Sequence, residues 1–178
     1  MTVVFTAVTR FDPKCEDWQK YIDWSGLTQL REVISLDGIL CPSVVDDLTD
    51  QDWQYNVHED FKTHLFHDLD YLLRKIDGIP QVNVLAVIHE PTTTELTSFL
   101  DSRFIFRGFD CLETDSGISA LVNCGGFDRA FASTDLSEYG LITGHAKAVN
   151  VQKTLQSEYP NEPHAQCGVW AIWQMVRE

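Results

Sequence analysis

Residues 58–76, HEDFKTHLFHDLDYLLRKI, form the longest segment in which apolar residues keep one constant period. Steps of three and four residues separate these apolar positions, which are Phe61, Leu65, Leu69, Leu72 and Ile76. That spacing places them on one face of an α-helix. It predicts a helix over the whole stretch, buried on this face against a sheet and ended by Gly78 and Pro80.

Segments rich in β-branched and apolar residues on both sides of this helix predict strands. They cover residues 2–9, 30–40, 53–57, 82–88, 103–112, 118–124 and 166–176. Further helices are predicted over residues 16–24, 92–100 and 145–158. The strands at 82–88 and 166–176 are almost continuously apolar, which is typical of strands covered on both faces.

This order of elements predicts an α+β fold, with an antiparallel or mixed sheet and helices packed on it. We favour a ferredoxin-like (βαββαβ) topology, because residues 2–88 follow that order. Residues 82–176 follow it too, so a pseudo-duplication into halves of about 1–80 and 81–178 is an alternative. The favoured interpretation is one domain over residues 1–178, a normal length for a single domain.

The charge balance narrows the range of partners. Thirteen Lys and Arg residues oppose twenty-seven Asp and Glu residues, and the formal net charge is −14. Such a field repels phosphate backbones and anionic membranes, so we expect neither nucleic acid nor a membrane as partner. The chain shows no secretory leader pattern and no apolar run of roughly 20 residues, which predicts a cytoplasmic protein.

An acidic segment precedes the predicted helix. Residues 44–60 contain six carboxylates, no Lys or Arg, and Trp53 as a potential anchor. The leading hypothesis is a small acidic binding or regulatory protein, such as an inhibitor or immunity-type protein for a basic partner. The predicted contact residues are Asp46, Asp47, Asp50, Asp52, Trp53 and Asp60. A soluble surface without a partner, or a homo-oligomer, would explain the composition as well.

The predicted helix also has a polar face. Asp60, His64 and His67 are spaced by four and three residues, which brings their side chains together on a helix. Carboxylate and imidazole groups in such a cluster can bind zinc or a similar ion. The competing interpretation is a solvated face, because this side of a sheet-packed helix faces water. No other cofactor is expected.

An enzyme or small-ligand protein with a His/Cys or metal-assisted site is the second hypothesis. The five cysteines lack the paired spacing of metal or redox motifs and are expected to be reduced thiols. His164 and Cys167 form an H-x-x-C pair, but strand spacing of three turns them to opposite faces. Cys167 is therefore expected in the core, and neither the neighbouring pair His89 and Glu90 nor Gly125-Gly126 forms a specific motif.

Overall fold

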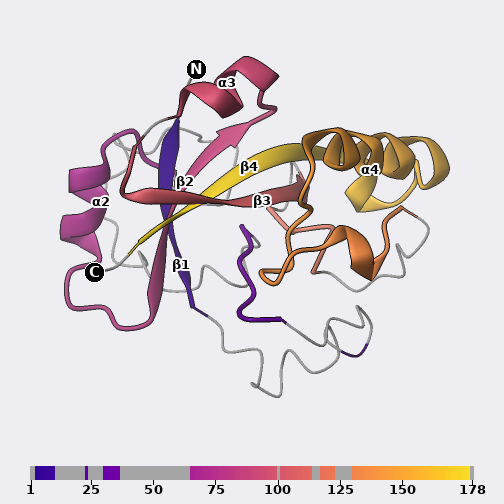
Figure 1. Ribbon diagram of the computed structural model, residues 1–178. Coiled ribbons are helices and arrows are strands. Elements are labelled where there is room, and N and C mark those ends of the chain that lie inside the picture. The colour runs from indigo at the N-terminus through magenta and orange to yellow at the C-terminus, as the bar shows by residue number, and fades with distance from the viewer. Residues whose placement is uncertain are drawn as a thin grey trace.

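The computed structural model describes residues 3–10, 23, 30–36, 65–99, 101–113, 117–122 and 130–176. Within them, one sheet contains β1 (Val4–Thr9), β2 (Val82–His89), β3 (Phe104–Glu113) and β4 (Cys167–Met175). The helices are α2 (Leu69–Lys75), α3 (Thr93–Ser98) and α4 (His145–Glu158), with 3-10 turns η2 (Ser133–Asp135) and η3 (Pro163–Gln166). Figure 1 shows this arrangement, which confirms the α+β class.

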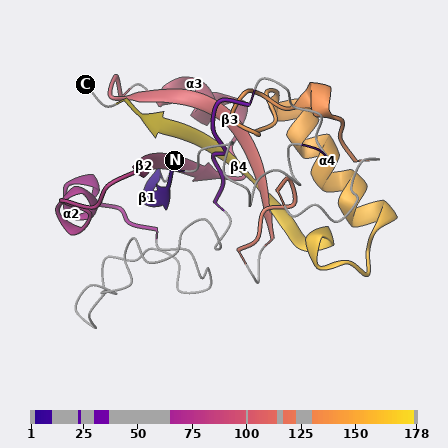
Figure 2. The ribbon, with the colours of Figure 1, turned by 90° about the horizontal axis from the view of Figure 1, so that it is seen from below.

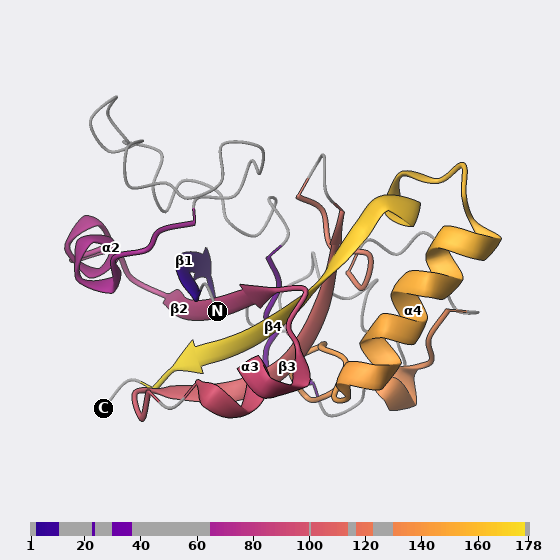
Figure 3. The ribbon, with the colours of Figure 1, turned by 90° about the horizontal axis from the view of Figure 1, so that it is seen from above.

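The strands follow the order β1-β2-β4-β3 across the sheet, and each neighbouring pair is antiparallel. Figure 3 shows this order from above. Because β4 is antiparallel to both β2 and β3, those two strands run parallel to each other. With α3 as their connection they form a split β-α-β unit, and β4 is inserted between its strands.

The favoured ferredoxin-like topology is not confirmed. β1 lies at one edge of the sheet and β3 at the other, while the last strand of the chain, β4, occupies an inner position. The strand predicted at 118–124 is described only for residues 117–122. There it makes a single bridge, between Leu112 and Ser119, and a hydrogen bond from the Ala120 N–H to the Cys111 carbonyl.

The helix predicted over residues 58–76 is shorter where the structure describes it. Residues 58–64 lie outside the described residues, and the prediction of helix for residues 65–68 is wrong. Phe66 instead pairs with Phe5 of β1 through two backbone hydrogen bonds of 2.7 and 2.8 Å. Asp68 then caps α2 by accepting a hydrogen bond of 2.9 Å from the Tyr71 N–H. The pairing with β1 overrides the helical periodicity at this point.

Two clusters of buried side chains cover the two faces of the sheet. One joins α2 and α4 to the strands, for example through Leu72, Leu155 and Val84. The other lies on the opposite face and includes Ile34 and Leu36, from the described segment at 30–36. The helices α2 and α4 lie at opposite ends of the molecule in Figures 1 and 2. The predicted apolar residues Leu69, Leu72 and Ile76 are buried in the first cluster, and Leu65, which precedes α2, is buried in the second.

Candidate functional site

The structure leaves the predicted sites largely untested. All the predicted contact residues for a basic partner lie outside the described residues, as does His64: Asp46, Asp47, Asp50, Asp52, Trp53 and Asp60. His67 is exposed and lies before the cap of α2. The metal site was predicted from helical spacing, and His67 is not in a helix. Among the described residues, no group of three His, Cys, Asp or Glu side chains is placed to hold a metal ion.

A groove of about 450 Å³ lies beside α2. It is bounded by α2, by the turn that follows, by β2 and by the end of β4. Most of its lining is apolar, and the lining residues are Leu73, Ile76, Asp77, Gly78, Ile79, Val84, Met175 and Val176. This shape and lining suit the side chain of a partner more than a polar substrate.

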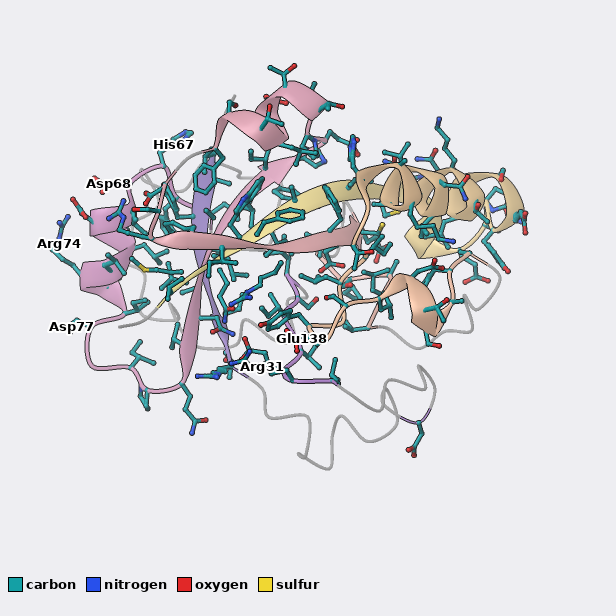
Figure 4. All side chains as sticks on the ribbon, viewed as in Figure 1. Arg31, His67, Asp68, Arg74, Asp77 and Glu138 are labelled. Carbon is teal, nitrogen blue, oxygen red and sulfur yellow. The ribbon has the colours of Figure 1, made fainter. Side chains whose placement is uncertain are left out.

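The groove continues along the outer side of α2. A hollow of about 410 Å³ is lined there by Asp70, Leu73, Arg74 and Asp77. Asp70 lies three and four residues before Leu73 and Arg74 and shares their side of α2, and Asp77 follows in the turn after the helix. Leu73 and Asp77 line both hollows, so the two form one continuous surface, which we call the α2 groove. Figure 4 shows Arg74 and Asp77 along the outer side of α2.

The α2 groove was missed in the sequence because its apolar lining comes from three separate segments, at residues 73–79, 84 and 175–176. The local signal is Leu73, which lies one position beyond the buried stripe and is only half-buried. An apolar side chain at that position widens the apolar face of the helix. Periodicity alone cannot show that Val84 and Met175 complete the surface, since both belong to predicted core strands.

Carboxylates dominate the two ends of the α2 groove. Asp77 follows the C-terminal end of α2, where the helix carbonyls already carry partial negative charge. The described residues provide no hydrogen bond or ion pair for Asp77, which is exposed. Asp70 lies towards the start of β3. There the pKa of Arg103 is raised, mainly by its hydrogen bond to Asp101 and to a smaller extent by the charge of Asp70. This distribution favours a cationic group at either end.

His89 and Glu90 lie at a junction between β2, β4 and α4. The His89 ring stacks on Trp170, with the centroids 4.5 Å apart. Glu90 has a left-handed φ of 46°, and its Oε1 accepts hydrogen bonds from Gln152 Nε2 (2.8 Å) and Val169 N (2.9 Å). Its carboxylate therefore fastens α4 and β4 to the end of β2. These contacts explain the strained backbone as a structural feature.

The two described cysteines are buried and face the same side of the sheet. Cys111 on β3 and Cys167 on β4 are free thiols, and both belong to the cluster that contains α4. The hydrogen bond with Cys167, together with burial, raises the pKa of the Cys111 thiol. A protonated, buried thiol is a poor nucleophile. Cys167 is buried as predicted, and the side chain of His164 lies outside the described residues.

A buried polar network lies on the other face of the sheet. Gln174 on β4 is its centre: its Nε2 donates to Glu32 (2.7 Å) and to Asn83 (2.8 Å). Its Oε1 accepts from Arg107, and Glu32 also accepts from Arg10, both at 2.7 Å. In Figure 4, Arg31 and Glu138 lie below the sheet on this side. The buried Asn83 Nδ2 finds no partner among the described residues, but the other hydrogen bonds link β4 to β2, to β3 and to the segment at 30–36.

The chain was compared with protein-family models, with curated proteins and with solved structures. None of them matches it. The function therefore has to be argued from the described residues themselves. Of the helices among these residues, none has the length and hydropathy that crossing a bilayer requires.

Proposed function

We propose that the protein is a small acidic binding or regulatory protein that recognises a basic protein through the α2 groove. One observation carries the proposal: an apolar groove ends at Asp77, an exposed carboxylate for which the described residues provide no partner. A protein interface commonly combines an apolar anchor in a pocket with charges at its rim. The α2 groove has both parts.

The two parts have different roles in binding. Leu73, Ile79 and Met175, the partly exposed apolar residues of the lining, would contact one bulky apolar side chain of the partner, which supplies most of the contact energy. Asp70 and Asp77 would attract Lys or Arg residues on either side of that anchor, while Arg74 between them disfavours a cation in the middle. The net charge of −14 would steer a cationic partner towards the chain.

The acidic segment at residues 44–60 lies outside the described residues and stays a predicted contact region for the basic partner. An inhibitor or immunity-type protein for a cationic enzyme is the specific form that we propose, and the cytoplasm is the proposed location. No observation among the described residues favours the second hypothesis, an enzyme or small-ligand protein with a His/Cys or metal-assisted site.

The experiment is a selection of random linear peptides displayed on phage, with the intact chain as bait. We expect the recovered peptides to carry Lys or Arg beside a bulky apolar residue. The double variant Asp70→Asn, Asp77→Asn should bind a synthetic copy of such a peptide about tenfold more weakly, the effect of two exposed charge pairs at about 0.7 kcal/mol each. Binding to the wild-type chain should weaken at higher salt.

The matched control is the double variant Glu158→Gln, Glu162→Gln, which removes the same charge from an exposed region at the end of α4. It should leave binding almost unchanged. Recovered peptides without basic residues would overturn the proposal. Equal weakening in both double variants would also overturn it, because net charge alone would then explain the binding.

A further inference from the structure

The N-terminal half of β3 is an open sheet edge. From Phe109 onwards the outer side of this edge strand is covered, since Phe109 and Ile142 exchange backbone hydrogen bonds of 2.8 and 2.9 Å. No described segment pairs with residues 104–107 on that side. Figure 1 looks onto this edge, with β3 at the front of the molecule. An open edge strand is a template for pairing with another strand.

The backbone groups that face outward follow from the ladder with β4. The Val176 N–H donates to the Arg103 carbonyl at 2.7 Å, so the backbone of Arg103 faces β4. Antiparallel pairing alternates along the strand, which turns the backbone of Ile105 towards β4 as well. The groups of Phe104 and Phe106 therefore face outward, although the Phe104 N–H donates to the Asp101 carbonyl.

Exposed apolar side chains gather at this same edge. Among the described residues, the large hydrophobic side chains that are exposed are Ile105 (46%), Phe106 (39%) and Val176 (46%). Ile105 and Phe106 project to opposite faces of the strand, and Val176 follows the neighbouring end of β4. A strand added at the edge would cover side chains on both faces.

We propose that residues 103–107 pair with the same residues of a second copy of this chain, which joins the two sheets into one. A two-fold axis through Ile105 places Phe104 opposite Phe106 of the second copy, where the Phe104 carbonyl would accept from the Phe106 N–H while the Phe104 N–H keeps its bond to Asp101. It places the two Ile105 side chains together in a non-hydrogen-bonded pair, where side chains are closest. The register stops before Gly108, whose outer side is occupied by Leu141 and Ile142.

The charges at the edge suit this register. Arg103 would lie opposite Arg107 of the second copy, but Asp101 already binds Arg103 through a hydrogen-bonded ion pair of 2.7 Å. That ion pair partly neutralises Arg103 and so reduces the repulsion between the two guanidinium groups.

The dependence on salt distinguishes this inference from the proposed function. Two copies that each carry −14 repel each other at long range. Salt shortens the Debye length from about 30 Å at 0.01 M to about 8 Å at 0.15 M, so added salt should strengthen the dimer. Binding of a basic partner should respond in the opposite direction, and either proposal can fail without the other.

Sedimentation velocity over a range of concentrations at low and moderate NaCl measures the association. We expect a monomer–dimer equilibrium that salt shifts towards dimer. Ile105→Lys should weaken the dimer tenfold or more, because two ammonium groups would meet on the axis. The charge-matched control Gln156→Lys, on the exposed face of α4, should associate at least as well as the wild-type chain.

A second variant tests the register itself. In Ile105→Cys the two introduced thiols should form a disulfide across the axis when glutathione disulfide oxidises them and is reduced to two glutathione molecules. Gln156→Cys should give no such dimer. A chain that stays monomeric at every salt concentration overturns the proposal and leaves the edge to an extended segment of another protein. A dimer that survives Ile105→Lys overturns it as well.

Discussion

At the scale of single residues, Gly108 shows how closely β3 is packed. The register of β3 against β4 shifts between Phe106 and Gly108, and Gly108 has a φ of 144°. A Cβ at this position would lie 2.7 Å from the Ile142 carbonyl oxygen and 2.8 Å from the Leu141 Cβ. Gly108→Ala should therefore lower the free energy of unfolding by about 2–4 kcal/mol, measured by urea denaturation.

The control is Gly144→Ala, at the N-terminal cap of α4. Gly144 has a φ of −119°, and a Cβ there meets nothing nearer than the Lys147 Cβ at 4.0 Å. It should cost less than about 1 kcal/mol. Similar costs for the two variants would show that the approach of residues 141–142 to β3 is not tight. A glycine inside a predicted strand is typical of a bulge, but the sequence does not show that residues 141–142 are what approaches it.

Cys111 should make the free energy of unfolding depend on pH. Its pKa in the folded chain is raised by the hydrogen bond with Cys167 and by burial. Above about pH 8.5, the ordinary pKa of cysteine, the unfolded chain loses a proton that the folded chain keeps. The free energy of unfolding should then fall as the pH rises, because the folded state binds more protons than the unfolded state.

Cys111→Ala isolates this contribution from other groups that titrate at high pH. Urea denaturation of both chains from pH 7 to about 10 should show a smaller loss of stability in the variant above pH 8.5. The test is how the difference in stability between the two chains changes with pH. The variant also loses buried volume, but that loss lowers its stability at every pH. Parallel curves over the whole range would contradict the raised pKa.

At the scale of elements, α2 begins at a capping residue that directly follows the residues paired with β1. Asp68 accepts a hydrogen bond from the Tyr71 N–H as the N-terminal cap. Asp68→Ala should lower the free energy of unfolding by about 1 kcal/mol, as measured by urea denaturation. Asp77→Ala, beyond the other end of the helix, should be neutral or slightly stabilising, because a carboxylate there opposes the helix dipole. Equal effects would indicate that Asp68 is not a cap.

The same helix shows what periodicity can and cannot predict. Burial of Leu65, Leu69, Leu72 and Ile76 was predicted correctly, because the spacing of apolar residues indicates which side chains are buried. The helix was nevertheless extended wrongly over residues 65–68, where Phe66 pairs with β1. Side-chain periodicity does not indicate which residue a backbone group pairs with. The partner of Phe66, Phe5, lies some sixty positions earlier in the chain. The α2 groove was missed for the same reason.

At the scale of the whole molecule, the positions of the strands in the sequence were easier to predict than their order in the sheet. The apolar runs at 82–88 and 166–176 predicted inner strands, and β2 and β4 occupy the two inner positions of the sheet. Their order was not predictable from the pattern, because pairing such as Val87 with Ile172 depends on contacts far apart in the sequence. The pattern also does not indicate which strand is inserted between β2 and β3, and β4 takes that place.

The inner position of β4 makes the end of the described chain essential for folding. β4 pairs with β2 on one side and β3 on the other, and Val169, Trp170 and Ile172 are completely buried. A chain that ends at Gln166 should therefore show no cooperative transition in urea and a reduced far-UV circular dichroism signal, because β3 loses its partner strand and both core clusters are opened. A chain that ends at Val176 keeps the hydrogen bond to Arg103 and should unfold cooperatively. Cooperative unfolding of the shorter chain would mean that β1, β2 and the helices form a core without β4, contrary to the sheet order on which both binding surfaces depend.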